Sequence, residues 1–457
     1  MSENQNKLKI CVLSGSPRGK YSTTLQTSLY LEKKLGQSEN CEFQYFYVGN
    51  RISALEKDIS PVKKLIEESD AVIFSYPVYT FLAPSQLHRF IAALKKSDIN
   101  VNGKFVTQIT TSKHFYDVTA HKYIEENCFD LQMKVVHGLS ADMEDLLKPE
   151  GQKNAEDFFK YFLYCVRNDI YEKSLLVPAR PIAKYKTQFC NSENVKNENK
   201  SGEFETVIVA DLSADDENLK NMIQDFQAIY PYKTRLVNIA EYKFIGGCLG
   251  CFNCASNGKC IYTDNFDVFL REKIQTASSI VLAFSIKDHS MGPRFKIYDD
   301  RQFCNGHRTV TSGMSFGYIV NGDYEVEKNL QTVIEARSEV GGNFLAGVGY
   351  DAETIKLMAC KMEYALQNKF ILPRNFYGVG GMKIFRDLIY LMRGLMKSDH
   401  EYYKKHGIYD FPQKQRGKMI LMCFLGAMVR NPKIKAKMGN KMNEGMIAPY
   451  KKLLEKM

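Results

Sequence analysis

The stretch KLKICVLSGSPRGKYSTTL, residues 7–25, decides the fold. Residues 7–15 have the pattern of a strand, and a segment with helical spacing begins at residue 22. A loop that ends on a helix N-terminus offers free backbone N–H groups and the positive end of the helix dipole. Hydroxyl and charged donors gather at that point: Ser14, Ser16, Ser22, Thr23, Thr24 and Arg18. This composition suits a monophosphate.

Other interpretations of the loop fit less well. It lacks the Gly-Lys-Ser/Thr ending of the Walker loop and the GxGxxG pattern of dinucleotide sites. A Ser- and Thr-rich cap before an ordinary helix is the structural alternative. Gly15, Pro17 and Arg18 serve no capping purpose, and they favour the phosphate site.

Strand and helix patterns alternate outward from this loop over residues 1–177. They predict a parallel sheet that helices cover on both faces. A polar stretch rich in Asn and Lys, residues 178–203, reads as a linker, and the alternation restarts over residues 204–373. We therefore expect an α/β fold of two tandem doubly wound parallel sheets, with a helical C-terminal extension at residues 374–457.

Two further loops should meet the phosphate loop, because ligands bind where the carboxyl ends of parallel strands share one sheet edge. One loop follows the third predicted strand and the other follows the fourth. An aromatic side chain and exposed backbone in the first of them suit a flat ring. The residues that we expect to hold the ring and its edge are Pro77, Val78, Tyr79, Thr80, Thr111, Ser112 and His114.

Four of the twelve cysteines lie within residues 248–260, spaced C-x2-C-x2-C-x5-C. They are Cys248, Cys251, Cys254 and Cys260. Zinc held by four thiolates prefers two separate knuckles, whereas an iron–sulfur cubane prefers a compact run such as this one. Free or redox-active thiols in a turn are the third interpretation. The cysteines outside this cluster read as small buried apolar residues.

Two motifs carry a resemblance to a known family. GSPR-xxx-ST at residues 15–23 and PVYTFLAPSQL at residues 77–87 resemble the flavodoxin-like NAD(P)H-dependent FMN reductases, and among them the iron–sulfur flavoproteins. The family pattern has Asn-Thr where this chain has Ser22 and Thr23. The resemblance implies non-covalently bound FMN in a first domain, residues 1–177, and NAD(P)H as hydride donor. It also implies a [4Fe–4S] cluster on the four cysteines of a second domain.

The two halves are complementary in this resemblance. The first loop of the second half carries acids, among them Asp211 and Asp216, which repel a phosphate, so we expect no FMN there. The matching stretch of the first half, NRISALEKDIS at residues 50–60, has no cysteine, so we expect no cluster there. In dimeric relatives the cluster of one subunit serves the flavin of the other, and fusion in one chain would fix that pairing.

A charged segment occupies the place of the ring loop in the second half. It reads KDHSMGPRFKIYDDRQFCNGH, residues 287–307. One interpretation is that it lines the shared site as a loop, together with His114 and His137. The favoured one is a salt-bridged surface between the halves.

The net charge of +10 is concentrated in the extension. Residues 374–457 hold 18 Lys and Arg against 6 Asp and Glu, a net +12, which leaves −2 for the remainder and argues against nucleic-acid binding. GVGG at residues 378–381 and DFP at residues 410–412 read as turns between apolar-faced helices. We expect the extension to dock on protein, either the body or a second subunit of a homo-oligomer. Peripheral contact with an anionic membrane is the alternative.

These observations lead to one functional expectation. With neither a signal peptide nor a spanning segment evident, we expect a cytoplasmic protein. We expect it to take hydride from NAD(P)H onto FMN and to pass electrons to a small-molecule or protein acceptor that the sequence does not name, through the cluster. The alternative is a flavodoxin-like electron carrier or redox sensor without a substrate of its own.

Overall fold

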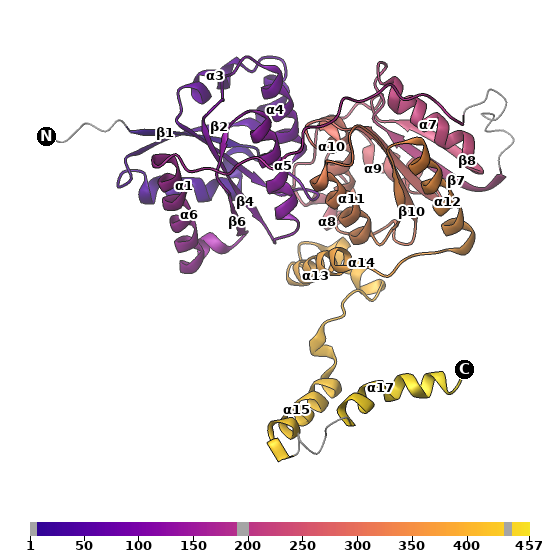
Figure 1. Cartoon of the computed structure of the whole chain (residues 1–457). Coiled ribbons are helices and arrows are strands. Elements are labelled where there is room, and N and C mark those ends of the chain that lie inside the picture. Colours follow the sequence, from indigo (N-terminus) through magenta and orange to yellow (C-terminus); the bar gives the residue numbers. More distant parts are fainter. Residues whose placement is uncertain (1–6, 190–200, 434–440) are drawn as a thin grey trace. The chain divides into compact units, whose positions relative to one another are not determined.

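The computed structural model describes residues 7–189, 201–433 and 441–457 (Figure 1). The first sheet is parallel, with strand order β2-β1-β3-β4-β5 and with β6 also paired to β4. Its strands are β1 (Leu8–Ser14), β2 (Cys41–Tyr47), β3 (Ala71–Pro77), β4 (Phe105–Ser112), β5 (Lys134–Val135) and β6 (Leu139–Asp142). Its helices are α1 (Thr23–Leu35), α2 (Val48–Leu55), α3 (Ser60–Glu67), α4 (Ser85–Lys96), α5 (Asp117–Asp130) and α6 (Pro149–Arg167).

Both faces of this sheet are covered. Ile10 and Val12 pack against α1 and α6 in one core. Cys11 and Leu13 point to the opposite face, because side chains alternate along a strand, and they are also fully buried. The prediction of a sheet covered on both faces is thus confirmed.

The second sheet repeats this arrangement, with strand order β11-β10-β9-β7-β8. Its strands are β7 (Ser201–Ala210), β8 (Tyr232–Asn238), β9 (Ser279–Ser285), β10 (Ser315–Asn321) and β11 (Phe344–Gly349). Its helices are α7 (Glu217–Ile229), α8 (Asn253–Asn257), α9 (Phe266–Phe269), α10 (Gly292–Arg301), α11 (Lys328–Gly341) and α12 (Ala352–Asn368). Each sheet places its second strand at the edge, followed by its first, third, fourth and fifth, which is the flavodoxin-like order. The predicted fold class is therefore confirmed.

The loop after the third strand also has the same conformation in both sheets. Residues 79–82 and residues 287–290 each close a tight turn through two reciprocal backbone hydrogen bonds of 2.8–3.0 Å. The two central residues of each turn have φ between 47° and 70°. Positive φ at both central positions is the geometry of a type I′ turn. The likeness of the two halves thus extends from strand order to one particular loop.

Equivalent helices of the two halves pack against each other. Helix α4 contacts α10, and α5 contacts α11. Each of these helices follows the third or fourth strand of its own sheet. The contact between the halves is thus built from the same elements on both sides, as in a two-fold symmetric interface.

Two sequence predictions differ from the structure. The loop expected over residues 287–307 contains a helix, α10, with Pro293 in its first turn. The turn expected at residues 378–381 lies inside helix α13 (Phe376–Leu391). The proposed domain boundaries remain predictions.

Residues 177–189 lie against the second sheet. Arg180 forms ion pairs with Asp323 and Glu325, and the Tyr185 hydroxyl donates a 2.8 Å hydrogen bond to Asp225. This part of the predicted linker, residues 178–203, is therefore held in place. Residues 190–200 lie outside the described residues, and β7 begins at Ser201.

The extension begins with a helix that packs on the second sheet. Helix α13 contacts α11, and glycine allows the close approach. A Cβ added at Gly381 would lie 2.6 Å from Val340 Cγ2, and one at Gly378 would lie 2.6 Å from the carbonyl oxygen of Glu339. The next helix, α14 (Lys397–Lys405), follows directly.

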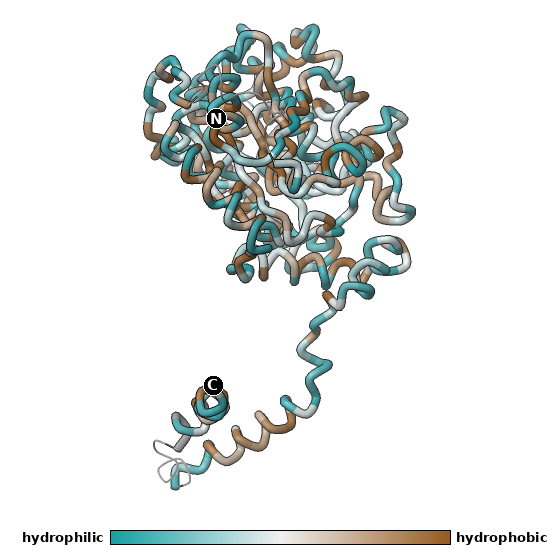
Figure 2. The backbone as a smooth tube through the Cα atoms, turned by 90° about the vertical axis from the view of Figure 1, so that its right-hand side faces the viewer, coloured by the Kyte–Doolittle hydropathy of each residue, from teal (hydrophilic) through white to brown (hydrophobic). Residues whose placement is uncertain are grey.

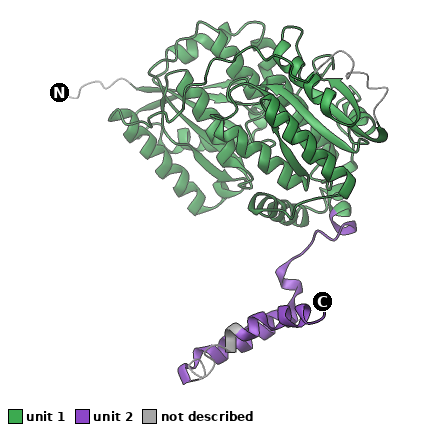
Figure 3. Ribbon diagram, turned by 45° about the vertical axis from the view of Figure 1, so that its right-hand side comes forward, with its two compact units in different colours: residues 1–402 green, residues 403–457 purple. Residues whose placement is uncertain are grey.

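The chain divides into two compact units, Met1–Tyr402 and Tyr403–Met457 (Figure 3). Both sheets and α13 belong to the first unit. The second contains α15 (Arg416–Arg430) and α17 (Lys441–Leu454), and much of α15 is apolar (Figure 2). Within the described ranges, every helix falls short of the length and apolar character that crossing a membrane requires.

Candidate functional site

The predicted phosphate loop joins β1 to α1 at the carboxyl edge of the first sheet. The Ser22 side chain caps α1 by accepting a hydrogen bond of 3.4 Å from the Leu25 backbone N–H. The first N–H groups of a helix have no partner inside the helix, so those of Thr23 and Thr24 are available to an anion. Gly19 has φ of +54°, and a Cβ there would lie 2.6 Å from Asn50 Nδ2. The loop is therefore folded tightly around this helix end.

The two loops that follow β3 and β4 reach the same edge. The hydroxyls of Thr24 and Thr111 lie 2.6 Å apart and connect α1 to the end of β4. Tyr79 is half-buried, and its desolvation raises the pKa of its hydroxyl, which keeps it protonated. The edge therefore offers neutral hydroxyls and backbone groups around an aromatic residue.

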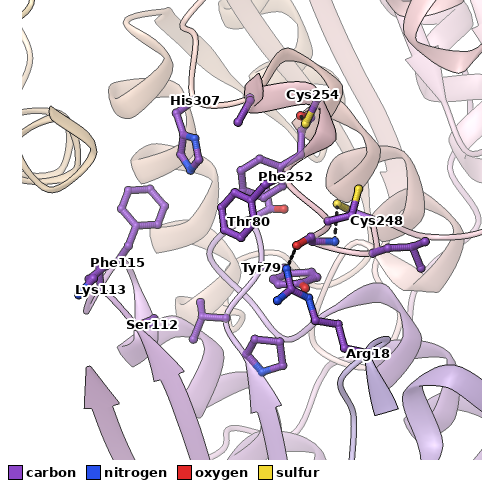
Figure 4. Close-up of a pocket in the computed structure, with 18 of the residues that line it drawn as sticks. Arg18, Tyr79, Thr80, Ser112, Lys113, Phe115, Cys248, Phe252, Cys254 and His307 are labelled. Carbon is purple, nitrogen blue, oxygen red and sulfur yellow. Dashed lines mark hydrogen bonds between the residues drawn. The ribbon is translucent and has the colours of Figure 1, made fainter. Parts of the chain in front are cut away.

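The cysteine loop of the second half lies directly against these loops (Figure 4). Arg18 of the phosphate loop donates a hydrogen bond to the carbonyl oxygen of Gly250, and its guanidinium lies 5.7 Å from the centre of the Phe252 ring. Gln86 Nε2 donates a hydrogen bond of 3.2 Å to the carbonyl oxygen of Cys248. A Cβ at Gly250 would lie 2.0 Å from the Tyr79 hydroxyl oxygen, so only glycine allows this approach. The phosphate loop and the cysteine loop thus form one site.

One pocket is enclosed by these elements and by two others. From the first sheet it is lined by Ser16, Arg18, Ser22, Thr23, Pro77, Val78, Tyr79, Thr80, Thr111, Ser112, Lys113 and Phe115. From the cysteine loop it is lined by Cys248, Gly250, Cys251, Phe252, Cys254, Cys260 and Tyr262. The remaining wall comes from Arg301, Phe303, Cys304, Gly306 and His307 and from Ile384, Phe385 and Leu388 of α13.

A buried charge cluster of the second half holds the ring loop of the first. Asp300 accepts hydrogen bonds of 2.7 Å from the Thr80 hydroxyl and from the Ser85 backbone N–H, which opens α4. Lys296 Nζ donates a 2.9 Å hydrogen bond to the carbonyl oxygen of Tyr79 and lies 2.5 Å from the Asp300 carboxylate. Burial raises the pKa of Asp300, and the neighbouring Lys296 opposes that rise. Helix α10 therefore determines where the ring loop lies.

The thiols of the cysteine loop differ in their surroundings. Cys254 Sγ lies 2.7 Å from the carbonyl oxygen of Phe303, and burial raises the pKa of Cys254 to about 11. Arg301 Nη2 lies 3.8 Å from Cys260 Sγ, and Arg301 also pairs with Asp264 at 2.7 Å. Cys304, a fifth thiol in the wall, is buried, and burial raises its pKa to about 12. Cys254 and Cys304 are therefore protonated at neutral pH.

The sequence suggests two metal centres for the four thiols of the cysteine loop, zinc and an iron–sulfur cluster. Among the residues that the structure describes, no group of three or more His, Cys, Asp or Glu side chains is placed to hold a metal ion. Zinc, with Zn–S bonds of about 2.3 Å, would need its thiolates close together, and no such preformed site exists there. All four thiols nevertheless line one pocket. Thiols are the donor type that an iron–sulfur cluster uses, but among the described residues the four are not gathered around a metal position for either centre.

The site fits the phosphate that the sequence predicts. The buried hydroxyls of Ser14 and Ser75, at the paired ends of β1 and β3, have no hydrogen-bond partner in the described structure. They lie beneath a loop whose helix N-terminus is already open to an anion. Neither hydroxyl lines the pocket, so the donors open to a phosphate are those of the loop and the helix N-terminus above them.

Helix α13 and an anchored histidine form the outer wall. The ring centres of Phe385 and Phe115 lie 4.3 Å apart, and His307 packs edge-on against Phe385 at 4.8 Å. His307 Nδ1 lies 2.9 Å from the buried carboxylate of Asp399 in α14. A Cβ at Gly306 would lie 2.2 Å from that carboxylate, so glycine is needed beside it. The wall is thus apolar and firmly held.

The matching edge of the second sheet is already engaged by protein groups. Asp211 pairs with Arg294 at 3.0 Å, and Asp216 accepts hydrogen bonds from Ser285 and Asn321. Acidic side chains in this place disfavour a phosphate. This edge is therefore unlike the phosphate loop of the first sheet.

Most of the residues that the sequence singled out lie together in the pocket wall, but Ser14, Gly15, Pro17, Thr24, His114 and His137 do not. Ser14 lies beneath the loop, and Pro17 is outside the lining. His114 is half-exposed and lies 2.8 Å from Asp117, and His137 lies 2.9 Å from Glu125. In the charged segment 287–307, the late residues line the pocket, while Asp288 pairs with Lys95 and His289 pairs with Asp130 across the two halves.

The sequence reasoning missed several wall residues. Lys113 and Phe115 belong to the loop after β4, which the sequence analysis places at the site. Their closeness in sequence to Ser112 and His114 could therefore have identified them. Arg301 ends α10, and Cys304 and His307 follow it; all three belong to the charged segment that one interpretation of the sequence placed at the site. The residues of α13 carry no local signal of a pocket, because they reach it only through packing on α11.

Comparisons with known proteins find one family match, which lies in the first half of the chain. Residues 8–142 match the family of NADPH-dependent FMN reductases. No curated protein is significantly similar to the chain.

Three solved structures are among those similar in fold. The apo NADH:FMN oxidoreductase EMOB is 17% identical and covers 35% of this chain and 89% of its own, with a TM-score of 0.31. FMN-bound general stress protein 14 of Treponema denticola is 13% identical and covers 35% of this chain and 99% of its own, with a TM-score of 0.28. FerB, a flavoenzyme NAD(P)H:(acceptor) oxidoreductase of Paracoccus denitrificans, is 16% identical and covers 35% of this chain and 98% of its own, with a TM-score of 0.29.

Proposed function

We propose that the chain is an FMN-dependent oxidoreductase that takes hydride from NAD(P)H and passes electrons to an acceptor. The observation that carries the proposal is a coincidence of two independent findings. The family match spans residues 8–142, and the three loops that this segment contributes all line one pocket. Bound flavin would supply the hydride chemistry, while the protein supplies binding, orientation and exclusion of water.

The phosphate of FMN is assigned to the N-terminus of α1. The N–H groups of Thr23 and Thr24 and the hydroxyls of Ser16 and Ser22 are the donors available there. Arg18 uses one N–H group on the Gly250 carbonyl, and a guanidinium has five such donors. Arg18 is therefore able to bind the phosphate and the cysteine loop together.

The flavin ring is assigned to the space between residues 77–80 and the cysteine loop. Backbone groups of the ring loop, held by Asp300 and Lys296, fix the orientation of the ring edge. Phe115, Phe303 and Phe385 leave an apolar surface opposite, which suits a flat nicotinamide or acceptor ring and keeps water out.

We further infer that Cys248, Cys251, Cys254 and Cys260 hold a [4Fe–4S] cluster. Four thiols on one pocket wall, with Arg301 beside Cys260 to offset negative charge, support this assignment. A cluster there would supply one-electron chemistry. The cysteine loop of the second half contacts the phosphate loop of the first within one chain, which is the pairing that fusion of two subunits would fix.

The experiment that tests the function is steady-state oxidation of NADPH and of NADH by FMN-loaded protein, with and without a soluble quinone. We expect turnover that depends on both the nicotinamide and the acceptor. A protein that binds FMN but shows no nicotinamide-dependent turnover with any acceptor would instead be an electron carrier or redox sensor.

A further inference from the structure

The second compact unit contains a helix that no single protein surface can cover. Helix α15 has the sequence RGKMILMCFLGAMVR, and residues 419–429 include no charged or amide side chain. Eleven residues make about three turns, so this segment is apolar on every side. None of the residues of α15 is buried, and Ile420 and Phe424 are 70% and 64% exposed. A helix of this kind needs an apolar environment around most of its circumference.

Helix α13 shows how a helix of the same extension docks on protein. It meets α11 through glycines that allow backbone contact, and Met382 and Ile389 are buried. Its other side is exposed, with Tyr390 and Leu391 among the exposed residues. Docking on one surface thus leaves half of a helix in solvent. For α15 that half would be as apolar as the docked half.

Helix α17 has the complementary pattern of a surface-lying helix. Between residues 444 and 454, the part of α17 whose side chains are described, the large apolar residues are exposed and fall on one side at helical spacing: Met446, Ile447, Tyr450, Leu453 and Leu454. Lys451 and Lys452 occupy other sides of the same turns. An apolar stripe with lysines beside it is typical of helices that lie in a membrane interface.

The charge of this region specifies the partner. In the sequence, no Asp or Glu occurs between Asp410 and Glu444, whereas eight Lys and Arg do. Lys414, Arg416 and Lys418 precede the apolar run of α15, and Arg430 and Lys433 follow it. Basic residues on both sides of an apolar segment match a surface of anionic headgroups over hydrocarbon. An apolar protein surface would not select for this charge.

We propose that residues 403–457 bind the surface of membranes that contain anionic lipids. The apolar run of α15 enters the headgroup–acyl boundary, α17 lies along it, and the lysines and arginines contact lipid phosphates. At 15 residues, α15 is about 23 Å long, less than the hydrocarbon thickness of about 30 Å, so it rests in one leaflet. The proposal does not depend on the proposed oxidoreductase function.

The chain contains no tryptophan, which allows a direct test on the full-length protein. Phe424→Trp introduces a single tryptophan into α15. Vesicles of phosphatidylcholine with phosphatidylserine should shift its emission to shorter wavelength, and lipids brominated on the acyl chains should quench it. Tyr364→Trp, on the exposed face of α12, is the matched control and should respond to neither.

Two further variants separate the apolar and electrostatic parts in a vesicle sedimentation assay. Ile420→Asp with Phe424→Asp should abolish binding, whereas Leu357→Asp on α12 should not. The triple change Lys414→Gln, Arg416→Gln and Lys418→Gln should weaken binding by about 100-fold, since each basic residue contributes roughly fivefold. Lys356→Gln with Lys361→Gln should leave it unchanged. High salt should weaken binding of the native chain.

The proposal is overturned if the native chain fails to sediment with phosphatidylserine vesicles. If it then forms an oligomer in solution that Ile420→Asp with Phe424→Asp dissociates, the occupant of these helices is a second copy of the chain. Equal binding to phosphatidylcholine alone and to phosphatidylserine vesicles would also contradict the assigned role of the basic residues.

Discussion

The carboxylate of Asp300 accepts a 2.7 Å hydrogen bond from the hydroxyl of Thr80. Asp300 belongs to α10 of the second sheet, and Thr80 belongs to the loop after β3 of the first. The same carboxylate holds the first N–H of α4 at 2.7 Å and the buried ammonium of Lys296 at 2.5 Å. The position of the ring loop is thus determined by residues more than 200 positions away. It follows that the second sheet is part of the flavin site that we propose.

Asp300→Asn should weaken FMN binding and destabilise the fold. Removing the carboxylate leaves Lys296 buried without its nearest charge, which costs about 3–5 kcal/mol. Asp299→Asn is the matched control, since Asp299 is also buried and pairs with Lys296 and Arg337 but does not touch the ring loop. We expect both variants to unfold at lower urea concentration and only Asp300→Asn to raise the FMN dissociation constant. Equal FMN affinity in the two variants would contradict this role.

Ser16→Ala combined with Arg18→Ala should remove most of the bound FMN. The change deletes a hydroxyl and a cation at the proposed phosphate site, and hydrogen bonds to a charged group contribute about 1.5–3 kcal/mol each. Lys20→Ala, in the same loop but outside the pocket lining, is the control and should retain its flavin. Flavin released by heating and measured by fluorescence gives the occupancy. A double variant with a full equivalent of FMN would show that the phosphate binds elsewhere.

Cys251→Ser should abolish the iron and acid-labile sulfide that we expect in anaerobically purified protein. The thiolate is the ligand, and a serine hydroxyl is a poor substitute for it. Cys360→Ser, an exposed cysteine of α12, should have no effect. Iron and sulfide assays per chain provide the measurement. Stoichiometric zinc, or no metal in the native protein, would exclude the cluster.

The stability of the first unit should fall as the pH rises from 6.5 towards 10. Burial would lower the pKa of His289, but hydrogen bonds to Asp130 and Glu327 raise it from its ordinary 6.5 to about 10. Because its pKa is higher in the folded state than in the unfolded state, protonated His289 contributes its full stabilisation of the fold below pH 6.5. That contribution is lost as the pH rises through the folded-state pKa of about 10. Thermal unfolding followed across this range should show the decline.

His289→Gln should lower the midpoint temperature of unfolding at neutral pH and make the loss of stability with rising pH less steep. His137→Gln, a more exposed histidine that also pairs with glutamate, is the comparison and should keep the native pH dependence. An unchanged slope in His289→Gln would mean that other groups cause the decline.

Chains ended after Tyr402 and after Pro373 should behave differently. The first retains α13 and its contacts with α11, so we expect a folded protein that binds FMN. The second loses Ile384, Phe385 and Leu388 from the pocket wall and uncovers Val340 and neighbouring apolar groups. We expect it to aggregate or to bind FMN several-fold more weakly. Indistinguishable flavin binding by the two would show that α13 is not part of the site.

The sequence predicted the parts of the site that depend on local pattern. Ser16, Arg18 and Ser22 stand between a strand and a helix, and a sheet edge brings such loops together whatever the rest of the chain does. The compact cysteine run likewise indicated that its four thiols share one wall of the pocket, while their chemistry stays a prediction. In both cases spacing along the chain determines what is close in space.

The missed parts depend on packing between distant elements. Helix α10 was interpreted as a loop because Lys296, Asp299, Asp300 and Arg301 are charged, whereas all four are buried and paired with other protein groups. Hydrophobic periodicity assumes that charges face solvent, so it fails where ion pairs form the interface. GVGG suggested a turn because glycine is a weak helix former, but α13 uses these glycines to approach α11.

The central claim is that one FMN lies at the carboxyl edge of the first sheet, where NAD(P)H reduces it. Anaerobic titration of the purified, FMN-reconstituted chain with NADPH and with NADH, followed by the visible absorbance of the flavin, tests it most directly. We predict one FMN per chain, bleached completely by about one equivalent of at least one of the two nicotinamides, since a hydride carries both electrons that the flavin accepts. Failure to retain FMN, or a bound flavin that both nicotinamides leave oxidised, would contradict the account.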